Sequence, residues 1–229
     1  MAGRTLWKGT IHFGDVDVPV KLHTAVREER ISFHLLHRRD RIRLKQQMVC
    51  AYEKTAVPAE EQARGFELEE GKYLLVDPAE LERAEPAESR AIEVHEFVKA
   101  EAIDPVFLDR LYHLEPDIQS KGYRALVAAM QELDMAGICT WTMRKRSYLG
   151  ALQARAEKLR LSTLRHADEV IPAGSLGPPD IALSEKELKI AGDLIRQLTA
   201  PFAPQKFENE HQKKLQDLQV VQSQAIAAI

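Results

Sequence analysis

The residues that could carry chemistry are few, and the first candidates are metal ligands. His34 and His37 lie three residues apart, with Cys50 downstream. Imidazole and thiolate are usual ligands of zinc, but a closed structural site needs four ligands, often including a Cys-x-x-Cys pair. Cys50 is followed by Ala-Tyr-Glu, which supplies no second thiolate. We therefore expect no metal site and no cofactor, and we interpret these histidines as surface or phosphate-facing groups.

Acidic pairs are the second candidates, Asp15 with Asp17 and Asp168 with Glu169. Such pairs can bind magnesium in nucleases, but neighbouring acids are usually solvated, and no nucleophile or general base accompanies these. The sequence also contains no P-loop, Rossmann fingerprint or Gly-x-Ser-x-Gly elbow. We predict no catalytic residues, and a metal-dependent nucleic-acid enzyme remains the alternative.

Cationic residues are the more informative candidates. One cluster comprises Arg38, Arg39, Arg41, Arg43 and Lys45. A second comprises Arg144, Lys145 and Arg146, directly after a predicted strand. Both clusters could reach phosphates, although a charge run can also be a solvated surface. Aromatic residues are sparse near both clusters, which favours contacts with a duplex backbone over stacking on single strands.

Net charge alone would argue against a nucleic-acid partner, because the chain of 229 residues carries −3 and has a pI near 6.3. The charge is segregated, however. Residues 1–50 hold 10 Lys and Arg against 5 Asp and Glu, giving +5, and residues 121–166 hold 9 against 3, giving +6. Residues 51–120 hold 7 against 18, giving −11. Two basic segments can therefore form a cationic groove while the acidic segment faces outward.

Composition indicates an ordinary folded protein that is long enough to bury a core. Hydrophobic residues make up 45% and charged residues 29%, which excludes a wholly disordered chain. No apolar run approaches the roughly 20 residues that span a bilayer, and the N-terminus lacks the pattern of a secretory signal. Two cysteines without such a signal are expected to be reduced thiols. We expect a cytoplasmic protein.

Several segments have the period-2 pattern of half-buried strands. Residues 16–23 alternate apolar with polar side chains, and Pro19 within them predicts an edge or irregular strand. Residues 41–45 alternate as well, so an extended conformation would place three cations on one face. Residues 136–143 and 159–164 also have strand character. Several short strands in one chain suggest a sheet or a barrel.

Helices are predicted in fewer places. Ser120 is a candidate N-cap for a helix whose apolar positions are Tyr123, Leu126, Met130 and Leu133. The Gly- and Pro-rich residues 174–179 read as a linker. Beyond it, Ser184 and Glu187 form a capping box before an apolar stripe comprising Leu188, Ala191, Leu194, Ile195 and Leu198. A second helix is predicted from the spacing of apolar residues between Phe207 and Ile229.

A series of short motifs resembles bacterial Ku proteins in the same order along the chain. The opening RTLWKGTIHFG at residues 4–14 and VPVKL at 18–22 closely resemble the start of that family. FHLLH at 33–37, RIR at 41–43, GFE at 65–67, GKY at 71–73, IDP at 103–105, YHLEP at 112–116 and TLRHADEV at 163–170 continue the resemblance. It covers roughly residues 4–170, and chance is an implausible source of so many ordered matches.

The resemblance implies a mixed α/β (α+β) fold, with a Ku-type β-barrel core, a DNA-encircling bridge and a C-terminal helical arm. We divide the chain accordingly into a core at 1–173, a linker at 174–183 and an arm at 184–229. The resemblance also implies a non-enzymatic homodimeric ring that binds double-stranded DNA ends in non-homologous end joining and recruits the ATP-dependent DNA ligase D, at the bacterial nucleoid. The cations expected to line the ring are Lys8, Lys21, Arg38, Arg39, Arg41, Arg43, Lys45, Arg144 and Arg146.

The chain departs from the family pattern in three features. Tyr52 and Glu53 stand where some relatives have a second cysteine near Cys50, and Ile171 stands where the family often has arginine. No Lys or Arg follows Lys214, whereas many relatives have a lysine-rich C-terminus, so we expect an altered or truncated ending. A dimeric interaction module without DNA function, joined through its C-terminal helices, remains a further alternative.

Overall fold

The computed structural model describes residues 5–27, 31–175, 177 and 181–227, and gives the backbone alone for residues 175 and 219–227. The chain divides into two compact units. One comprises Met1–Arg27 with Lys45–Ile171, and the other comprises Glu28–Leu44 with Pro172–Ile229. Each unit is described by itself below.

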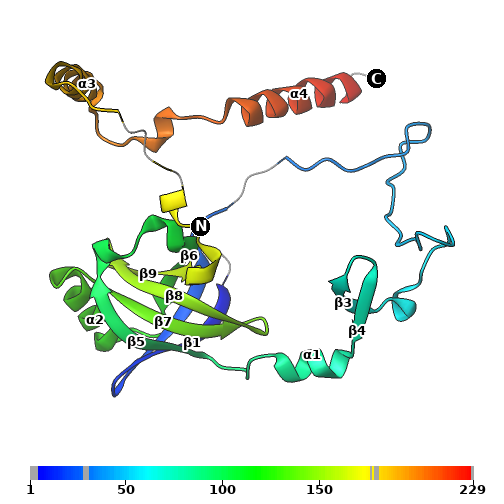
Figure 1. The fold of residues 1–229 in the computed structure, drawn as a ribbon, viewed down its shortest axis with the longest axis horizontal. Coiled ribbons are helices and arrows are strands. Elements are labelled where there is room, and N and C mark those ends of the chain that lie inside the picture. Colours follow the sequence, from blue (N-terminus) through cyan, green and yellow to red (C-terminus); the bar gives the residue numbers. More distant parts are fainter. Residues whose placement is uncertain (1–4, 28–30, 176, 178–180, 228–229) are drawn as a thin grey trace. The chain divides into compact units, whose positions relative to one another are not determined.

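Seven strands of the first unit close into a barrel (Figure 1). They are β1 (Thr5–Phe13), β2 (Val16–Thr24), β5 (Ala91–Lys99), β6 (Leu108–Pro116), β7 (Met135–Met143), β8 (Arg146–Arg155) and β9 (Lys158–Leu164). The order around the barrel is β1-β2-β6-β9-β8-β7-β5. All neighbours are antiparallel except β1 and β5, which are parallel and close the barrel. The prediction of a mixed α/β protein built on a barrel is confirmed.

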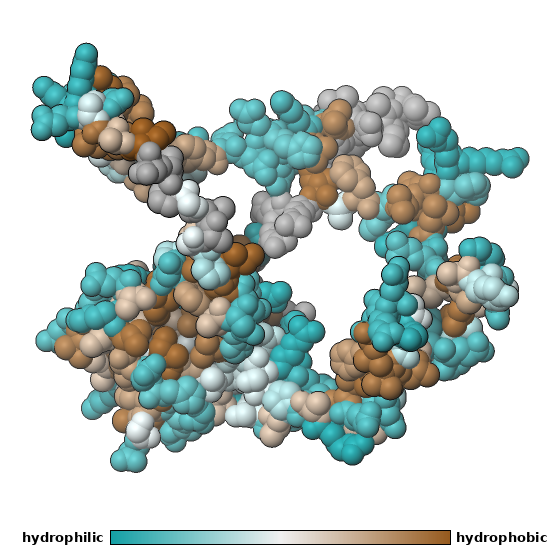
Figure 2. Space-filling model, viewed as in Figure 1, coloured by the Kyte–Doolittle hydropathy of each residue, from teal (hydrophilic) through white to brown (hydrophobic). Residues whose placement is uncertain are grey.

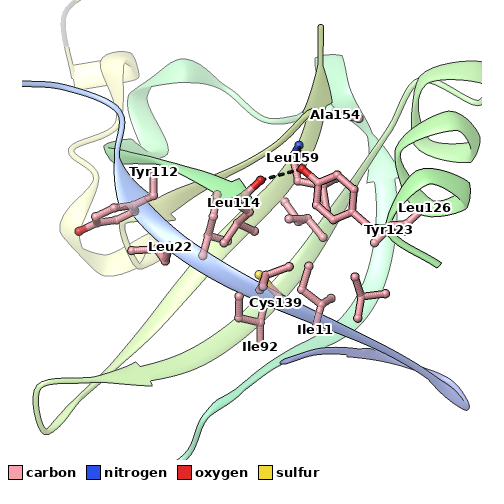
Figure 3. Close-up of a cluster of buried hydrophobic side chains, with 14 of the residues drawn as sticks. Ile11, Leu22, Ile92, Tyr112, Leu114, Tyr123, Leu126, Cys139, Ala154 and Leu159 are labelled. Atoms are coloured by element: carbon pink, nitrogen blue, oxygen red, sulfur yellow. Dashed lines mark hydrogen bonds between the residues drawn. The ribbon is translucent and has the colours of Figure 1, made fainter. Parts of the chain in front are cut away.

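The barrel forms because its strands alternate apolar with polar residues. In β2, Val18, Val20 and Leu22 are fully buried while the residues between them are partly exposed. Leu159 and Leu161 of β9 are likewise fully buried. Figure 3 shows such side chains from neighbouring strands meeting in one cluster, together with the Cys139 thiol. Period-2 patterning thus sets an apolar interior against a polar outer face.

Pro19 was predicted to mark an edge or irregular strand, and the edge alternative was wrong because β2 has a neighbour on each side. Pro19 lies opposite Thr10 of β1, and β2 pairs on its other side with β6. The pairing with β6 begins only at Val20, opposite Pro116, and the Pro19 carbonyl accepts a hydrogen bond from the Asp117 N–H. In a strand the N and C=O of one residue face the same neighbour. The missing N–H of Pro19 therefore faces the place where β6 ends, and the ladder keeps all its bonds.

Helix α2 (Lys121–Glu132) packs against β2, β7 and β8 of the barrel. Ser120 Oγ accepts a hydrogen bond from the Tyr123 N–H at 3.3 Å, which confirms the predicted N-cap. The buried positions are Tyr123, Leu126, Val127 and Met130. Leu133, predicted on the same stripe, is the C-cap residue and is 58% exposed, because the helix ends one residue before it.

The described residues between β2 and β5, 25–27 and 31–90, have little regular structure. It contains the hairpin β3 (Arg64–Glu69) and β4 (Lys72–Val76), followed by helix α1 (Pro78–Ala84). Asp77 caps α1 by accepting from the Ala79 N–H at 2.8 Å. The hairpin leaves most of its large apolar side chains exposed, namely Phe66, Leu68, Tyr73, Leu74 and Leu75.

Two helices form the C-terminal part, α3 (Glu185–Leu198) and α4 (Glu210–Ala227). The predicted capping box is present, since Ser184 Oγ accepts from the Glu187 N–H at 3.3 Å and the Glu187 carboxylate accepts from the Ser184 N–H at 2.8 Å. The second predicted helix begins at Glu210 rather than at Phe207. Ile229, and residues 176 and 178–180 of the predicted linker, lie outside the described residues. No helix in the described ranges is long and apolar enough to cross a membrane.

Tyr123 joins α2 to two strands of the barrel. Its hydroxyl donates to the Leu114 carbonyl of β6 at 2.7 Å and accepts from the Leu159 N–H of β9 at 2.9 Å (Figure 3). The side chain is only 5% exposed, and burial raises the pKa of the phenol. One hydroxyl therefore satisfies two buried backbone groups at the place where β6 and β9 meet the helix.

We expect Tyr123→Phe to keep the ring in the core but to leave the Leu114 carbonyl and the Leu159 N–H unpaired. Unpaired buried groups typically cost about 1–3 kcal/mol, so the free energy of unfolding should fall by about that amount. Denaturant titration measures it. The matched control is Tyr52→Phe, since Tyr52 is 94% exposed, and an equal loss in both variants would contradict the proposed role of the hydroxyl.

Candidate nucleic-acid interface

The first cationic cluster lies on a short hairpin-like loop. Leu36 and Arg43 form an antiparallel bridge, and the His37 N–H donates to the Ile42 carbonyl at 2.8 Å. Asp40 closes the turn by accepting from the Ile42 N–H at 3.0 Å and contacting His37 Nδ1 at 2.7 Å. These contacts, the backbone one foremost, lower the pKa of the Asp40 carboxyl. The loop thus displays Arg38, Arg39 and Arg41 around its turn.

Residues 41–45 are therefore not one extended strand, and the prediction that three cations share a face there was wrong. Arg41 has φ +61°, in the left-handed region, because it sits in the turn. Arg43 lies on the returning arm, and Lys45 follows in an exposed stretch. The period-2 pattern of this segment therefore spans the turn and the returning arm of the loop, and it does not belong to one strand of a sheet.

Lys8 and Lys21 are brought together by the barrel. They stand directly opposite each other on β1 and β2, and both approach the same oxygen of Asp117, at 3.7 Å and 2.8 Å. The hydrogen bond between Lys21 and Asp117 is the main reason why the pKa of Lys21 is raised and that of Asp117 lowered. This pair of lysines is therefore partly neutralised by a carboxylate before any partner binds.

The second cluster forms the tight turn between β7 and β8. Met143 pairs with Arg146, and the two residues between them have positive φ, 52° at Arg144 and 61° at Lys145. This is the geometry of a type I′ turn, which usually contains Asn or Gly. Lys145 contacts Glu85 at 2.8 Å, and this hydrogen bond raises its pKa. Arg144 and Arg146 are exposed and form no ion pair within the described ranges.

Sequence reasoning missed a basic row on the outer face of the barrel. His23, His113 and Arg160 stand opposite one another on β2, β6 and β9, and Lys158 lies two residues before Arg160. His23, His113 and Lys158 line a cavity of about 730 Å³ beside α2. The alternation of Lys158 and Arg160 with buried Leu159 and Leu161 was the available signal, but only strand register shows which histidines lie beside them.

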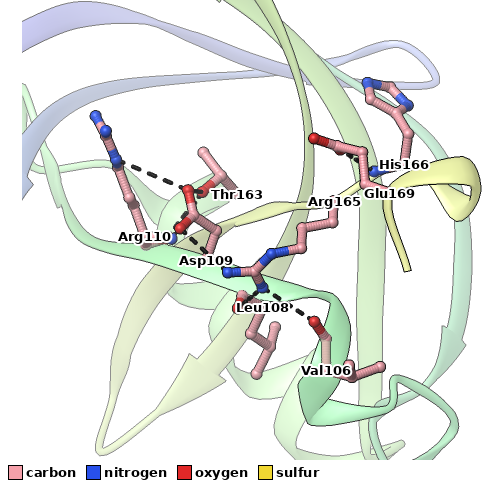
Figure 4. Close-up of polar contacts among 8 residues, drawn as sticks. All are labelled: Val106, Leu108, Asp109, Arg110, Thr163, Arg165, His166 and Glu169. Atoms are coloured by element: carbon pink, nitrogen blue, oxygen red, sulfur yellow. Dashed lines mark hydrogen bonds and ion pairs between the residues drawn. The ribbon is translucent and has the colours of Figure 1, made fainter. Parts of the chain in front are cut away.

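The acidic pair Asp168 and Glu169 belongs to a structural turn. Glu169 accepts from the His166 N–H at 2.7 Å and caps the short 3₁₀ helix Ala167–Glu169. Just before it, Arg165 donates to the carbonyls of Val106 and Leu108 at 3.0 Å and 2.5 Å (Figure 4). These contacts attach the end of β9 to the start of β6.

The same figure shows Asp109 between Arg165 and Thr163, at 3.5 Å and 3.4 Å. The Thr163 hydroxyl also accepts from the Arg110 N–H at 2.8 Å. The motif at residues 163–170 thus fixes the segment that follows the last barrel strand. Most of its polar side chains form hydrogen bonds with nearby groups of the protein.

The candidate zinc ligands do not converge in the part of the chain that the structure describes, where no group of three or more His, Cys, Asp or Glu side chains could hold a metal. His37 contacts Asp40, and Cys50 sits in a turn where the Lys54 N–H donates to its carbonyl at 2.9 Å. The backbone N–H groups of Glu53 and Tyr52 lower the pKa of the Cys50 thiol.

A closed barrel with exposed arginine loops and a basic outer face presents side chains of the kind that contact phosphates. Residues 12–190 match the family model "Ku70/Ku80 beta-barrel domain". The chain is 66% identical over 218 residues, 95% of its length and 85% of the relative, to "Non-homologous end joining protein Ku 2" of Geotalea uraniireducens (strain Rf4).

Two further relatives carry the name "Non-homologous end joining protein Ku". That of Koribacter versatilis (strain Ellin345) is 37% identical over 217 residues, covering 93% of this chain and 74% of the relative. That of Mycolicibacterium smegmatis (strain ATCC 700084 / mc(2)155) is 32% identical over 221 residues, covering 94% and 70%. The chain belongs to the Ku family.

The two cysteines should differ in reactivity. Cys139 is fully buried, its thiol lies 3.5 Å from the Gly150 carbonyl, and burial raises its pKa to about 12. Cys50 is partly exposed and has a lowered pKa. Because the thiolate is the reactive form, we expect a thiol reagent to modify one cysteine per folded chain and two in denaturant.

Cys50→Ser is the matched variant and should show no rapid modification while folded. Rapid modification of Cys139 in that variant would contradict the closed barrel interior.

Proposed function

We propose that this chain acts in non-homologous end joining as a homodimeric ring that binds double-stranded DNA ends without reading their sequence. The observation that carries the proposal is a set of exposed arginines that form no ion pair within the described ranges. They are Arg38, Arg39, Arg41, Arg43, Arg144 and Arg146. Membership of the Ku family supports the same function, since relatives are named for this repair process.

Arginine suits this task because its planar guanidinium can donate two parallel hydrogen bonds to one phosphate. Backbone contacts position a protein on DNA but carry no base information, and a protein that must accept any break requires that property. In a two-fold dimer each basic segment appears twice. A cationic lumen is therefore compatible with a net charge of −3 per chain.

Exposed apolar surface supports association with a second copy. Leu188, Leu194 and Ile195 of α3 are 58%, 54% and 68% exposed, and Figure 2 shows apolar side chains uncovered on the surface. The β3–β4 hairpin is similarly uncovered, with Phe66 62% exposed. Contiguous apolar residues at the surface commonly mark interaction sites. In the proposal, both surfaces are buried when two chains form the ring.

In this proposal residues 1–173 form the core and bridge, residues 174–183 the linker and residues 184–229 the helical arm. The protein is a scaffold without catalytic residues that recruits the ATP-dependent DNA ligase D, in the bacterial cytosol at the nucleoid. The ligase step is tested by asking whether the protein retains that ligase on a linear duplex.

Arg43→Ala tests the contribution of the arginine loop. If Arg43 contacts phosphate in both protomers, the substitution removes about two contacts and should lower the slope of log K against log salt by up to about 2. The measurement is duplex binding at a series of stated salt concentrations. The control is Lys189→Ala, which removes a charge on the face of α3 opposite its apolar stripe, and an unchanged slope for Arg43→Ala would place that side chain away from DNA.

The ring itself makes a topological prediction. A closed ring with a large dimer interface admits a duplex only at an end, so binding should be strong on linear DNA of any sequence and weak on closed circles. Bulky blocks attached to both ends beforehand should prevent binding, whereas blocks attached afterwards should trap the protein. If a dimer of confirmed solution mass binds circles and linear DNA equally, the ring is contradicted. An open basic cleft would then explain the binding.

A further inference from the structure

The outer face of strands β2, β6 and β9 carries a row of basic and titratable side chains. Strand register aligns His23, His113 and Arg160 directly across neighbouring strands, and buried residues flank both His113 and Arg160 in sequence. Directly opposed side chains on one face stand about 5 Å apart at Cβ. All three therefore belong to a single outward row, and Lys158 lies beside it on the same face of β9.

Two members of this row have polar atoms that no described residue satisfies. Nδ1 of His113 is buried and forms no hydrogen bond with any described residue. Arg160 is partly buried, and its guanidinium likewise forms no hydrogen bond or ion pair within the described ranges. A guanidinium has five donors, and those of Arg160 are therefore available to an anion. The unpaired buried nitrogen of His113 does not stabilise the barrel.

The surroundings favour an anion. The charged and titratable side chains near His113 come from every element packed around the cavity, and they are His23, Glu115, Tyr123, Arg124, Glu157, Lys158 and Arg160. The two carboxylates do not balance the three permanent cations, and Glu115 already contacts His23 at 3.1 Å. Burial lowers the pKa of His113 most, and the charges of Arg160 and Lys158 lower it further. The local field is thus positive around a neutral imidazole.

We infer that His113, Arg160 and Lys158 form a phosphate-binding subsite on the outer face of the barrel, which takes backbone phosphates of duplex DNA. This inference rests on the proposed DNA-binding function, and it adds a second DNA-contacting surface to the arginine loops. Cations at alternate positions of β9 stand about 7 Å apart, so Lys158 and Arg160 can contact different phosphates. The imidazole between β2 and β9 adds a donor that strengthens on protonation.

A phosphate beside His113 would offset the positive field and make protonation easier. DNA binding should then take up protons, so affinity should rise as pH falls from about 7.5 towards 5.5, by as much as about tenfold per pH unit for each proton taken up. The chain contains eight histidines, of which His113 is one. The diagnostic quantity is therefore the difference in pH dependence between the wild type and His113→Gln.

The experiment measures binding of the full chain to a linear duplex, with melting temperature as a check on folding. Arg160→Gln and Lys158→Gln should each weaken binding at 0.1 M salt, on the order of tenfold for each phosphate that the variant no longer reaches, and should flatten the salt slope. Lys189→Gln is the charge-matched control and should change neither. His113→Gln should reduce the pH dependence.

Histidine-labelled protein distinguishes the possible outcomes by NMR, with the His113 signal assigned from its absence in His113→Gln. The inference expects duplex DNA to shift this signal at far lower concentration than inorganic phosphate does. A shift with phosphate but none with duplex would overturn the assignment to DNA and leave a site for another anion. If the wild type binds duplex while the three variants match Lys189→Gln, the subsite is wrong and the proposed function stands. If the wild type binds no duplex, the proposed function and this inference both fail.

Discussion

Closure of the seven strands into a barrel obliges each strand to send alternate side chains inward, and the remaining features of the first unit follow from this division. The interior is filled by aliphatic residues of several strands, among them Ile11, Leu22 and Leu152, all fully buried. The other side chains of each strand lie on the outer face of the barrel, next to the outward side chains of the neighbouring strands. Packing of the core thus fixes the outer rows, including those that hold the cations.

The structure divides its cations into two kinds. Several lysines are held by carboxylates, as Lys21 is by Asp117 and Lys145 by Glu85. The arginines of the 36–43 loop are exposed and have no such partner within the described ranges. Exposed ion pairs stabilise a fold little, so leaving arginines unpaired costs little stability. The hydrogen-bond donors of these unpaired arginines remain available to a phosphate, as the proposed function requires.

Uncovered apolar surface is the second feature that a single chain leaves unexplained. Helix α3 has its own N-cap in Ser184, so its start does not depend on a partner. Its apolar stripe is exposed nevertheless, with Leu198 at 82%. A preformed helix with an uncovered stripe can bury that stripe on a second copy without having to nucleate the helix at the same time. The β3–β4 hairpin is a second uncovered apolar surface, with Phe66 62% and Leu75 70% exposed.

What the sequence determined by itself is local. The alternation in β2, that in β9 as far as Leu161, the Ser120 cap of α2 and the capping box of α3 each depend on residues within a few positions of one another, and each was confirmed. Beyond Leu161 the alternation in β9 was wrong, because Ser162 is buried as well. The period and spacing of the confirmed features are direct consequences of strand and helix geometry. The order of Ku-like motifs is likewise a property of the linear chain.

What only the tertiary structure decided depends on strand order and register, because these join residues far apart in the chain. Pro19 lies in a strand that has a neighbour on each side, and its missing N–H removes no bond to β6 because β6 ends beside it. Arg41 turns where its pattern predicted an extended strand, because Asp40 closes a loop there. His113 meets Arg160 although 47 positions in sequence separate β6 and β9 at this point. No local pattern encodes such a pairing, since one residue of slip would turn every side chain of a strand to the opposite face.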